Sequence, residues 1–215
     1  MKFKLFLLFV FSVLLFTYFS YTVAREKWQQ IDFDTTVKLQ DHISRRFDSI
    51  FSYFSILGSA EVTVGFSLVM MFLSLIRKHF LAIIGWLMIV PATVAEIFGK
   101  LVVFHPGPPG FFHRTLQPTS LPSFYVHTDF SYPSGHMTRT IFIIVILAVL
   151  MVFASKSFLP YKLITLGILV LLGIMMALTR VYLGEHWLSD VLGGSLLGAA
   201  MGLLASILIL RSQKV

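Results

Sequence analysis

The chain has 215 residues, of which 57% are hydrophobic, and it carries a net charge of +7 and no cysteine. This apolar fraction exceeds the ~45–50% that is usual in soluble domains, so we expect an integral membrane protein. The apolar runs leave no room for a separate soluble domain, and residues 1–215 are expected to form one domain. The lack of cysteine excludes disulfide frameworks and thiolate sites.

Six apolar segments are each close to the ~20 residues that a helix needs to cross the hydrocarbon core. They predict an all-α polytopic protein with about six transmembrane helices in one bundle. The first segment could instead be a secretory signal, because Thr22-Val23-Ala24 resembles a cleavage site. It is longer than the usual ~7–15-residue signal core, so we favour a retained anchor. The predicted spans are residues 5–24, 56–76, 80–99, 138–154, 161–178 and 188–210.

Two long stretches separate these spans. Residues 25–55 are mixed and charged, and apolar residues recur at helical spacing from Ile43 to Phe54, which predicts an amphipathic helix on the membrane surface. Residues 100–131 form a loop rich in proline, glycine and aromatic residues. Loops of this length are usually functional or disordered, and the apolar content argues against disorder.

The distribution of charge predicts the orientation. The side of the termini has cations and no Asp or Glu, so the positive-inside rule places both termini in the cytoplasm. Residues 25–55 and 100–131 are then non-cytoplasmic, and the long loop at 100–131 faces outward from the plasma or inner membrane. Topology thus explains the positive charge, and no nucleic acid partner is expected; the partners are membrane lipids. The cations used are Lys2, Lys4, Arg77, Lys78, Lys156, Lys162, Arg211 and Lys214.

Ionisable residues gather at the border between the last two spans. Charge in the hydrocarbon is costly, so such residues suggest a functional site, although an interfacial cap of aromatic and charged residues would look similar. His186 and Asp190 are four residues apart, so a helix would place the carboxylate beside the imidazole. Such a carboxylate would hold the ring in one tautomer. Glu185 is expected to face water.

Two further clusters lie at the same predicted border. Ser134-Gly135-His136 precedes a predicted helix, whose free N–H groups and dipole suit a phosphate. Lys100 follows Glu96 by four residues, which predicts a structural ion pair. Histidines and cations without cysteine and with few free carboxylates favour an anionic substrate over a divalent metal, so we expect no metal and no cofactor.

These clusters resemble the motifs of the type 2 phosphatidic acid phosphatases, a family of membrane lipid phosphatases related in active-site plan to the vanadium haloperoxidases. Residues 133–136 are similar to the second motif, PSGH. Residues 179–190 are similar to the third motif, SR-x5-H-x3-D, with Thr179 in place of serine. The first motif, K-x6-RP, is present only in part, because Gly107 replaces its arginine between Lys100 and Pro108.

The resemblance implies a role for each motif residue. His186 would attack phosphorus and form a phosphohistidine, with Asp190 holding its other ring nitrogen. His136 would protonate the leaving oxygen and then activate water. The groups expected to bind the phosphate oxygens are Lys100, Ser134, Gly135 and Arg180.

A substitute for the missing arginine is also expected. Arg139 is favoured because it lies one helical turn after His136. Arg114 and His105, both from the loop, are the other candidates. Snorkelling of Arg139 to the interface is the alternative explanation for that residue, and a different substrate head group is the alternative explanation for Gly107.

The predicted function is metal-independent hydrolysis of a lipid phosphate or polyprenyl diphosphate. Phosphatidic acid, phosphatidylglycerol phosphate and undecaprenyl diphosphate are all compatible substrates. Three alternatives stay open: a lipid-linked phosphotransferase of the same plan, a homologue that binds lipid phosphate without catalysis, and a transporter with a charged pathway. The sequence does not predict an oligomeric state.

Overall fold

The computed structural model describes residues 2–117, 129–153 and 158–212. Three features used above lie outside the described residues: part of the loop at 118–128, the end of the fourth span at Ala154, and the cations Lys156 and Lys214. The described residues form helices and turns, with no strand beyond an isolated bridge between Pro106 and Phe130.

Six helical segments of the described chain are long and apolar enough to cross a membrane. The protein is therefore an integral membrane protein of the predicted all-α, polytopic class. The first span is α1, and the second ends in α4, which begins where the hydroxyl of Ser59 accepts the N–H of Val62 at 3.3 Å. The candidate spans are α1 (Lys2–Ala24), the segment Arg45–Ile76 that ends in α4 (Ala60–Ile76), α5 with α6 (Phe80–Leu87 and Ile89–Val103), α7 (Gly135–Phe153), α8 (Leu159–Tyr182) and α9 (Leu188–Ser212).

The third span is broken between α5 and α6. Pro91 has no N–H to donate to the carbonyl of Leu87, four residues earlier, and its ring would clash with that carbonyl. The helix therefore ends at Leu87 and restarts at Ile89. The second half carries Glu96 and Lys100 on its last turns.

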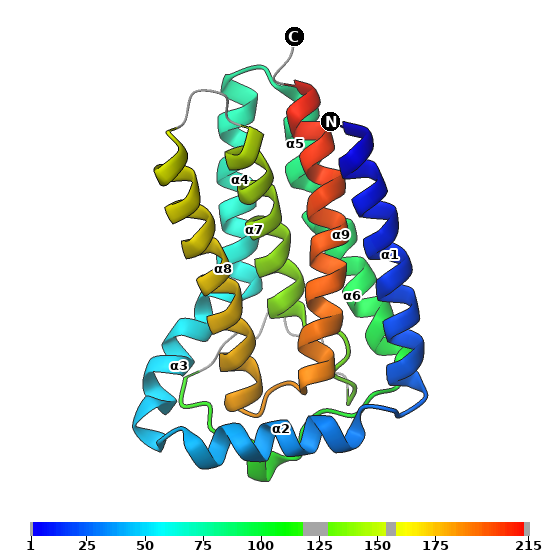
Figure 1. Ribbon diagram of the computed structural model, residues 1–215, viewed down its shortest axis with the longest axis vertical. Coiled ribbons are helices and arrows are strands. Elements are labelled where there is room, and N and C mark those ends of the chain that lie inside the picture. Colours follow the sequence, from blue (N-terminus) through cyan, green and yellow to red (C-terminus); the bar gives the residue numbers. More distant parts are fainter. Residues whose placement is uncertain (1, 118–128, 154–157, 213–215) are drawn as a thin grey trace.

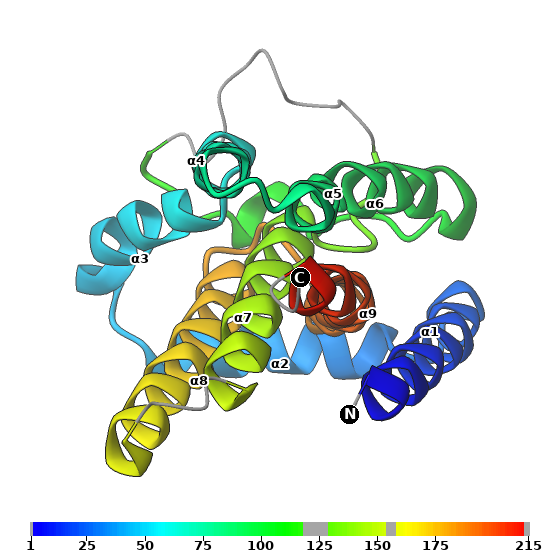
Figure 2. The same ribbon diagram turned by 90° about the horizontal axis from the view of Figure 1, so that it is seen from above.

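The centre of the bundle is the close packing of α7 on α9 (Figures 1 and 2). Glycines recur every fourth residue on the contacting face of α9. A side chain at Gly198 would collide with the carbonyl of Thr138, and one at Gly202 would crowd Phe142 and Val145. Small residues allow two helix backbones to approach closely. This contact brings the PSGH motif, which leads into α7, against the start of α9.

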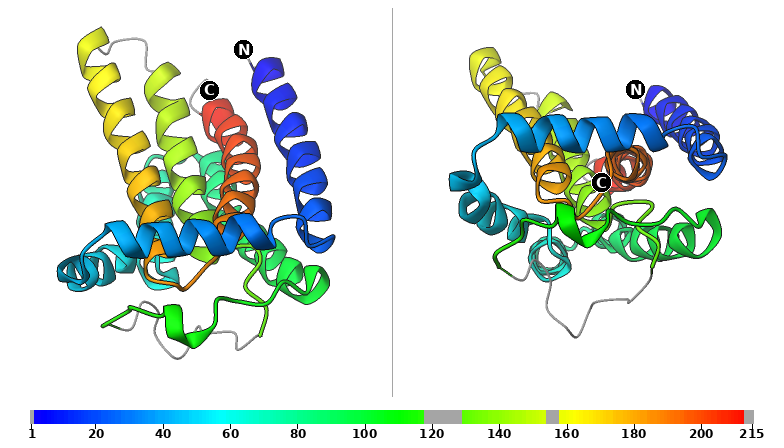
Figure 3. Two further views of the ribbon diagram at one scale, coloured as in Figure 1. Left: turned by 60° about the horizontal axis from the view of Figure 1, so that its bottom comes forward. Right: turned by 90° about the horizontal axis from the view of Figure 1, so that it is seen from below.

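Two shorter helices, α2 (Gln29–His42) and α3 (Asp48–Ser55), lie across one end of the bundle (Figure 3). The start of α1 and the end of α9 lie at the opposite end (Figure 1). Of the helix predicted over residues 43–54, the structure has residues 45–55, as a short 3-10 turn, Arg45–Phe47, followed by α3; it begins later than predicted because the chain is extended at Ser44, whose hydroxyl caps the turn. The side of the membrane on which each end lies stays a prediction.

Candidate active site

A tight turn between α8 and α9 carries the third motif. Gly184 has a φ of +67°, a left-handed conformation that glycine adopts without strain. The backbone N–H groups of Glu185 and His186 donate to the carbonyl of Arg180, at 3.2 and 3.3 Å. The turn therefore keeps Arg180 and His186 at the same end of the bundle, the end that α2 crosses.

His186 and Asp190 form a buried pair on this turn. His186 Nδ1 lies 3.3 Å from Asp190 Oδ2, and the two residues are 8% and 0% exposed. The same oxygen accepts the backbone N–H of Trp187 at 2.9 Å, which fixes the carboxylate at the first turn of α9. With Nδ1 facing Asp190, Nε2 is the ring nitrogen that is left to react.

The surroundings of His186 favour its neutral form. Burial lowers the pKa of His186 well below its usual 6.5, and the nearby cations Arg180 and Lys100 act in the same direction. Glu185 and Glu96 oppose the shift with smaller effects. The imidazole is therefore unprotonated at neutral pH, which is the state that a nucleophile needs.

The second motif lies at the start of α7. The N–H of Ser134 donates to the carbonyl of Asp190 at 3.0 Å, which joins this motif directly to the His186–Asp190 pair. The hydroxyl of Ser134 lies 3.5 Å from the N–H of Met137 and caps the helix. Gly135 and His136 follow in the first turn, where the backbone N–H groups of a helix start and the helix dipole favour an anion.

Glu96 holds two of the candidate phosphate-binding cations. Its Oε1 lies 2.8 Å from Lys100 Nζ, and its Oε2 lies 2.9 Å from Arg139 Nη1. The carboxylate also lies against Gly135, where a Cβ would be 2.6 Å from both oxygens. An anion of the protein itself thus occupies the space beside the start of α7. The predicted pair with Lys100 is present, and Arg139 faces this cluster and does not snorkel.

Arg180 is held by a second carboxylate. Its guanidinium donates to Glu185 and to the hydroxyl of Ser55, and Glu185 also accepts the hydroxyl of Thr115. The expectation that Glu185 faces water is wrong, because its side chain is paired and only 17% exposed. Each of the three cations at the site thus has a carboxylate partner, Glu96 or Glu185, so a bound phosphate would compete with these carboxylates.

The model of the PAP2 superfamily matches residues 80–214. The chain belongs to the PAP2 superfamily. The match includes all three motif regions and every candidate site residue.

Two solved structures share the PAP2 fold of this chain. The crystal structure of the first transmembrane PAP2 type phosphatidylglycerolphosphate phosphatase from Bacillus subtilis has a TM-score of 0.73 at 20% identity, covering 92% of this chain and 93% of that chain. LpxE of Aquifex aeolicus has a TM-score of 0.58 at 23% identity, covering 81% of this chain and 94% of that chain. No curated protein sequence matches significantly.

Gly107, which stands where the PAP2 motif has arginine, has room for a side chain. A Cβ at Gly107 would make ordinary contacts, 3.6 Å from the Cβ of Ser131. Arg114 is not at the site, because it donates to the Gln40 carbonyl at 3.1 Å and stacks on Tyr182. Arg139 stays the predicted substitute, since it shares Glu96 with Lys100.

His105 is buried behind the His186–Asp190 pair. Its Nε2 lies 3.8 Å from Asp190 Oδ1 and 3.6 Å from Asp32 Oδ2, so it faces two carboxylates and no site cation. Asp32 in turn accepts the N–H and hydroxyl of Ser189 at 2.8 and 2.7 Å. Asp32 could not be found from local spacing, because it meets Ser189 and His105 from distant segments and the buried residues of α2 are polar, Asp32 and Thr36.

The described residues contain no group of three or more His, Cys, Asp or Glu side chains that could hold a metal ion. The carboxylates at the site are paired with its cations or with the ring of His186, and paired carboxylates beside several cations fit a phosphate better than a divalent cation. Independence from metals stays a prediction for an activity assay.

Proposed function

We propose that the protein is a phosphatase that hydrolyses a lipid phosphate through a phosphohistidine at His186. The observation that carries this proposal is the buried His186–Asp190 pair at one end of a transmembrane bundle, with the cations Arg180 and Lys100 near the ring of His186. Membership of the PAP2 superfamily supports it, as do two structural relatives whose names describe a phosphatidylglycerolphosphate phosphatase and LpxE.

In the first step, Nε2 of His186 attacks phosphorus in line with the leaving lipid oxygen. A P–N bond forms, the P–O bond to the lipid breaks, and His136 gives its proton to the departing oxygen. Asp190 stabilises the positive charge that develops on the ring through its contact with Nδ1. Lys100, Arg180 and the N–H groups at the start of α7 neutralise the equatorial oxygens.

In the second step, water replaces the lipid alcohol. Neutral His136 takes a proton from the water as its oxygen attacks phosphorus, and the P–N bond breaks. Inorganic phosphate leaves, and His186 is again the neutral imidazole that its burial favours. No atom of a metal takes part in either step.

The test is phosphate release from a lipid panel by the purified full chain in detergent with EDTA present. Wild type should release phosphate, vanadate should inhibit because it mimics the trigonal-bipyramidal phosphate, and His186→Ala should lose at least about 1,000-fold in rate. His42→Ala is the matched control, because His42 is an exposed histidine on α2 whose Nδ1 lies 2.8 Å from the Lys38 carbonyl of its own helix. Release that His186→Ala leaves unchanged would refute the proposal.

A further inference from the structure

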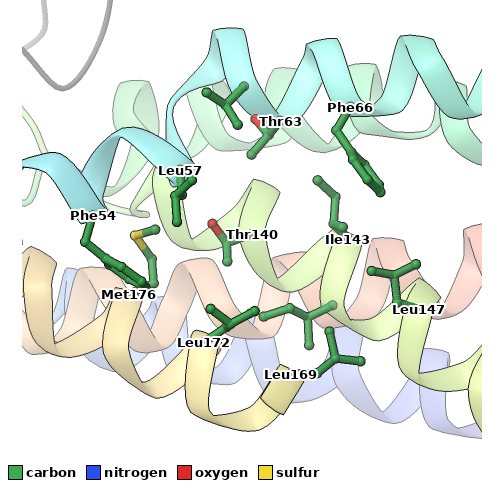
Figure 4. Close-up of a pocket in the computed structure, with 12 residues that line it drawn as sticks. Phe54, Leu57, Thr63, Phe66, Thr140, Ile143, Leu147, Leu169, Leu172 and Met176 are labelled. Atoms are coloured by element: carbon green, nitrogen blue, oxygen red, sulfur yellow. The ribbon is translucent and has the colours of Figure 1, made fainter. Parts of the chain in front are cut away.

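An apolar cavity of about 190 Å³ lies between α4, α7 and α8, deeper in the bundle than the candidate active site. Figure 4 shows that α4 and α8 supply opposite walls and that α7 lies between them. The outward faces of these helices carry exposed apolar side chains, as expected in contact with lipid. The lining includes Phe54, Leu57, Phe66, Ile143, Leu172 and Met176.

The cavity adjoins the catalytic end of the bundle at Gly58. A Cβ at Gly58 would lie 3.0 Å from the Met176 side chain, which lines the cavity, and 3.1 Å from the ring of His136. His136 and the cavity wall are therefore separated by the width of one glycine. A lipid whose phosphate is at the histidines would have its nearest apolar space here.

One polar atom in the cavity wall is unusual. The hydroxyl of Thr140 is buried and has no hydrogen-bond partner within the described chain. Thr63, on the opposite wall, also has a hydroxyl, but it donates to the Ser59 carbonyl at 2.6 Å. A buried hydroxyl normally finds a partner, and a serine or threonine in a helix commonly bonds the carbonyl four residues earlier. Thr140 therefore has a donor to offer to a ligand.

The position of Thr140 defines which part of a lipid it would meet. Thr140 follows His136 by four residues, so it lies on the same face of α7, one turn or about 6 Å deeper in the membrane. In a glycerophospholipid, the ester carbonyls lie a few bonds from the phosphate, between the head group and the apolar tails. A polyprenyl phosphate has only hydrocarbon at that depth.

We propose that this cavity binds an acyl chain of an ester-linked glycerophospholipid substrate, and that the Thr140 hydroxyl donates a hydrogen bond to its ester carbonyl. The inference rests on the proposed function and narrows its substrate class to phosphatidic acid and its head-group derivatives. Thr140 is thus a specificity-determining residue, and it takes no part in the chemical steps at His186 and His136.

The test compares two substrates that differ only in these carbonyls: dioleoyl phosphatidic acid and its dialkyl ether analogue. Thr140→Val removes the hydroxyl at nearly constant shape, and kcat/KM on the diester should fall roughly 2- to 13-fold, the range for one hydrogen bond, with no change on the diether. Thr140→Ser keeps a hydroxyl, so its ratio of kcat/KM on the diester to kcat/KM on the diether should equal that of wild type. Thr63→Val, in the same cavity, is the matched control and should affect both lipids equally.

A second variant tests occupancy of the cavity. Ile143→Trp fills it, so KM should rise for both lipids, whereas hydrolysis of p-nitrophenyl phosphate, which has no tail, should not change. The inference is overturned if kcat/KM of Thr140→Val falls equally on the diester and the diether. It is also overturned if Ile143→Trp leaves the KM for both lipids unchanged, because the cavity would then hold a bulk lipid and not the substrate. Failure of the proposed function looks different: wild type would then release phosphate from none of the three substrates.

Discussion

Replacing Glu96 with glutamine tests the charge balance of the site. Glu96 is 4% exposed and holds both Lys100 and Arg139. Removing one partner of a buried ion pair typically costs about 3–5 kcal/mol, because the remaining charge is left without compensation. Glutamine keeps a carbonyl acceptor, so we expect about 3 kcal/mol for Glu96→Gln. For a chain of this length that corresponds to a fall in Tm on the order of 6–12 °C.

A bound phosphate analogue should raise the thermal stability of Glu96→Gln. The Glu96 carboxylate competes with substrate phosphate for Lys100 and Arg139, so vanadate should raise the Tm of Glu96→Gln more than that of wild type. The measurement is thermal unfolding in detergent with and without vanadate. Asp41→Asn, which removes an exposed charge on α2, is the control and should change Tm little. The reasoning is wrong if Glu96→Gln is as stable as Asp41→Asn, or if vanadate stabilises all three proteins equally.

Three further predictions concern pH and the altered motif. Because burial lowers the pKa of His186, the acid limb of kcat/KM should lie below pH 6.5; a limb at or above 6.5 would contradict this. Burial raises the pKa of Asp32 to about 6, so the native state binds a proton that the unfolded chain releases near pH 4. Stability should therefore be greatest below about pH 4 for this group and fall as pH rises through 6, and Asp32→Asn should remove that slope from Tm measured between pH 4 and 6.5. Gly107→Arg introduces the arginine of the first motif at a position where a Cβ fits beside Ser131. Vanadate should inhibit this variant at least several-fold more strongly than wild type. Equal inhibition of the two proteins would show that a side chain at position 107 does not reach the phosphate.

Local spacing predicted the pairs that lie on one helix. His186 with Asp190 and Glu96 with Lys100 are each four residues apart, and the structure has them at 3.3 and 2.8 Å. The number of spans also followed from local composition, because a helix in lipid must satisfy its own backbone and needs about 20 apolar residues. These features depend on neighbours in the sequence, so one sequence was enough.

Contacts between distant segments could not be predicted in the same way. Arg139 and Glu96 are 43 residues apart, and Asp32 and Ser189 are 157 apart. Whether such residues meet depends on how closely the helices pack. For α7 and α9, the glycines of α9 set this distance. Glu185 was assigned to water although Arg180 is only five residues away, because the turn that brings the two together, and the loop that carries its second partner Thr115, have paths that the sequence does not define.

The most direct test of the account is to trap the phosphoryl group on the enzyme. Wild-type protein is mixed briefly with phosphatidic acid labelled with ³²P in its phosphate and is then quenched in alkali, in which a phosphohistidine is stable. The account predicts an acid-labile label on the peptide that contains His186, and no label in His186→Ala. Rapid phosphate release by wild type with no labelled peptide would contradict a phosphohistidine and favour direct attack by water.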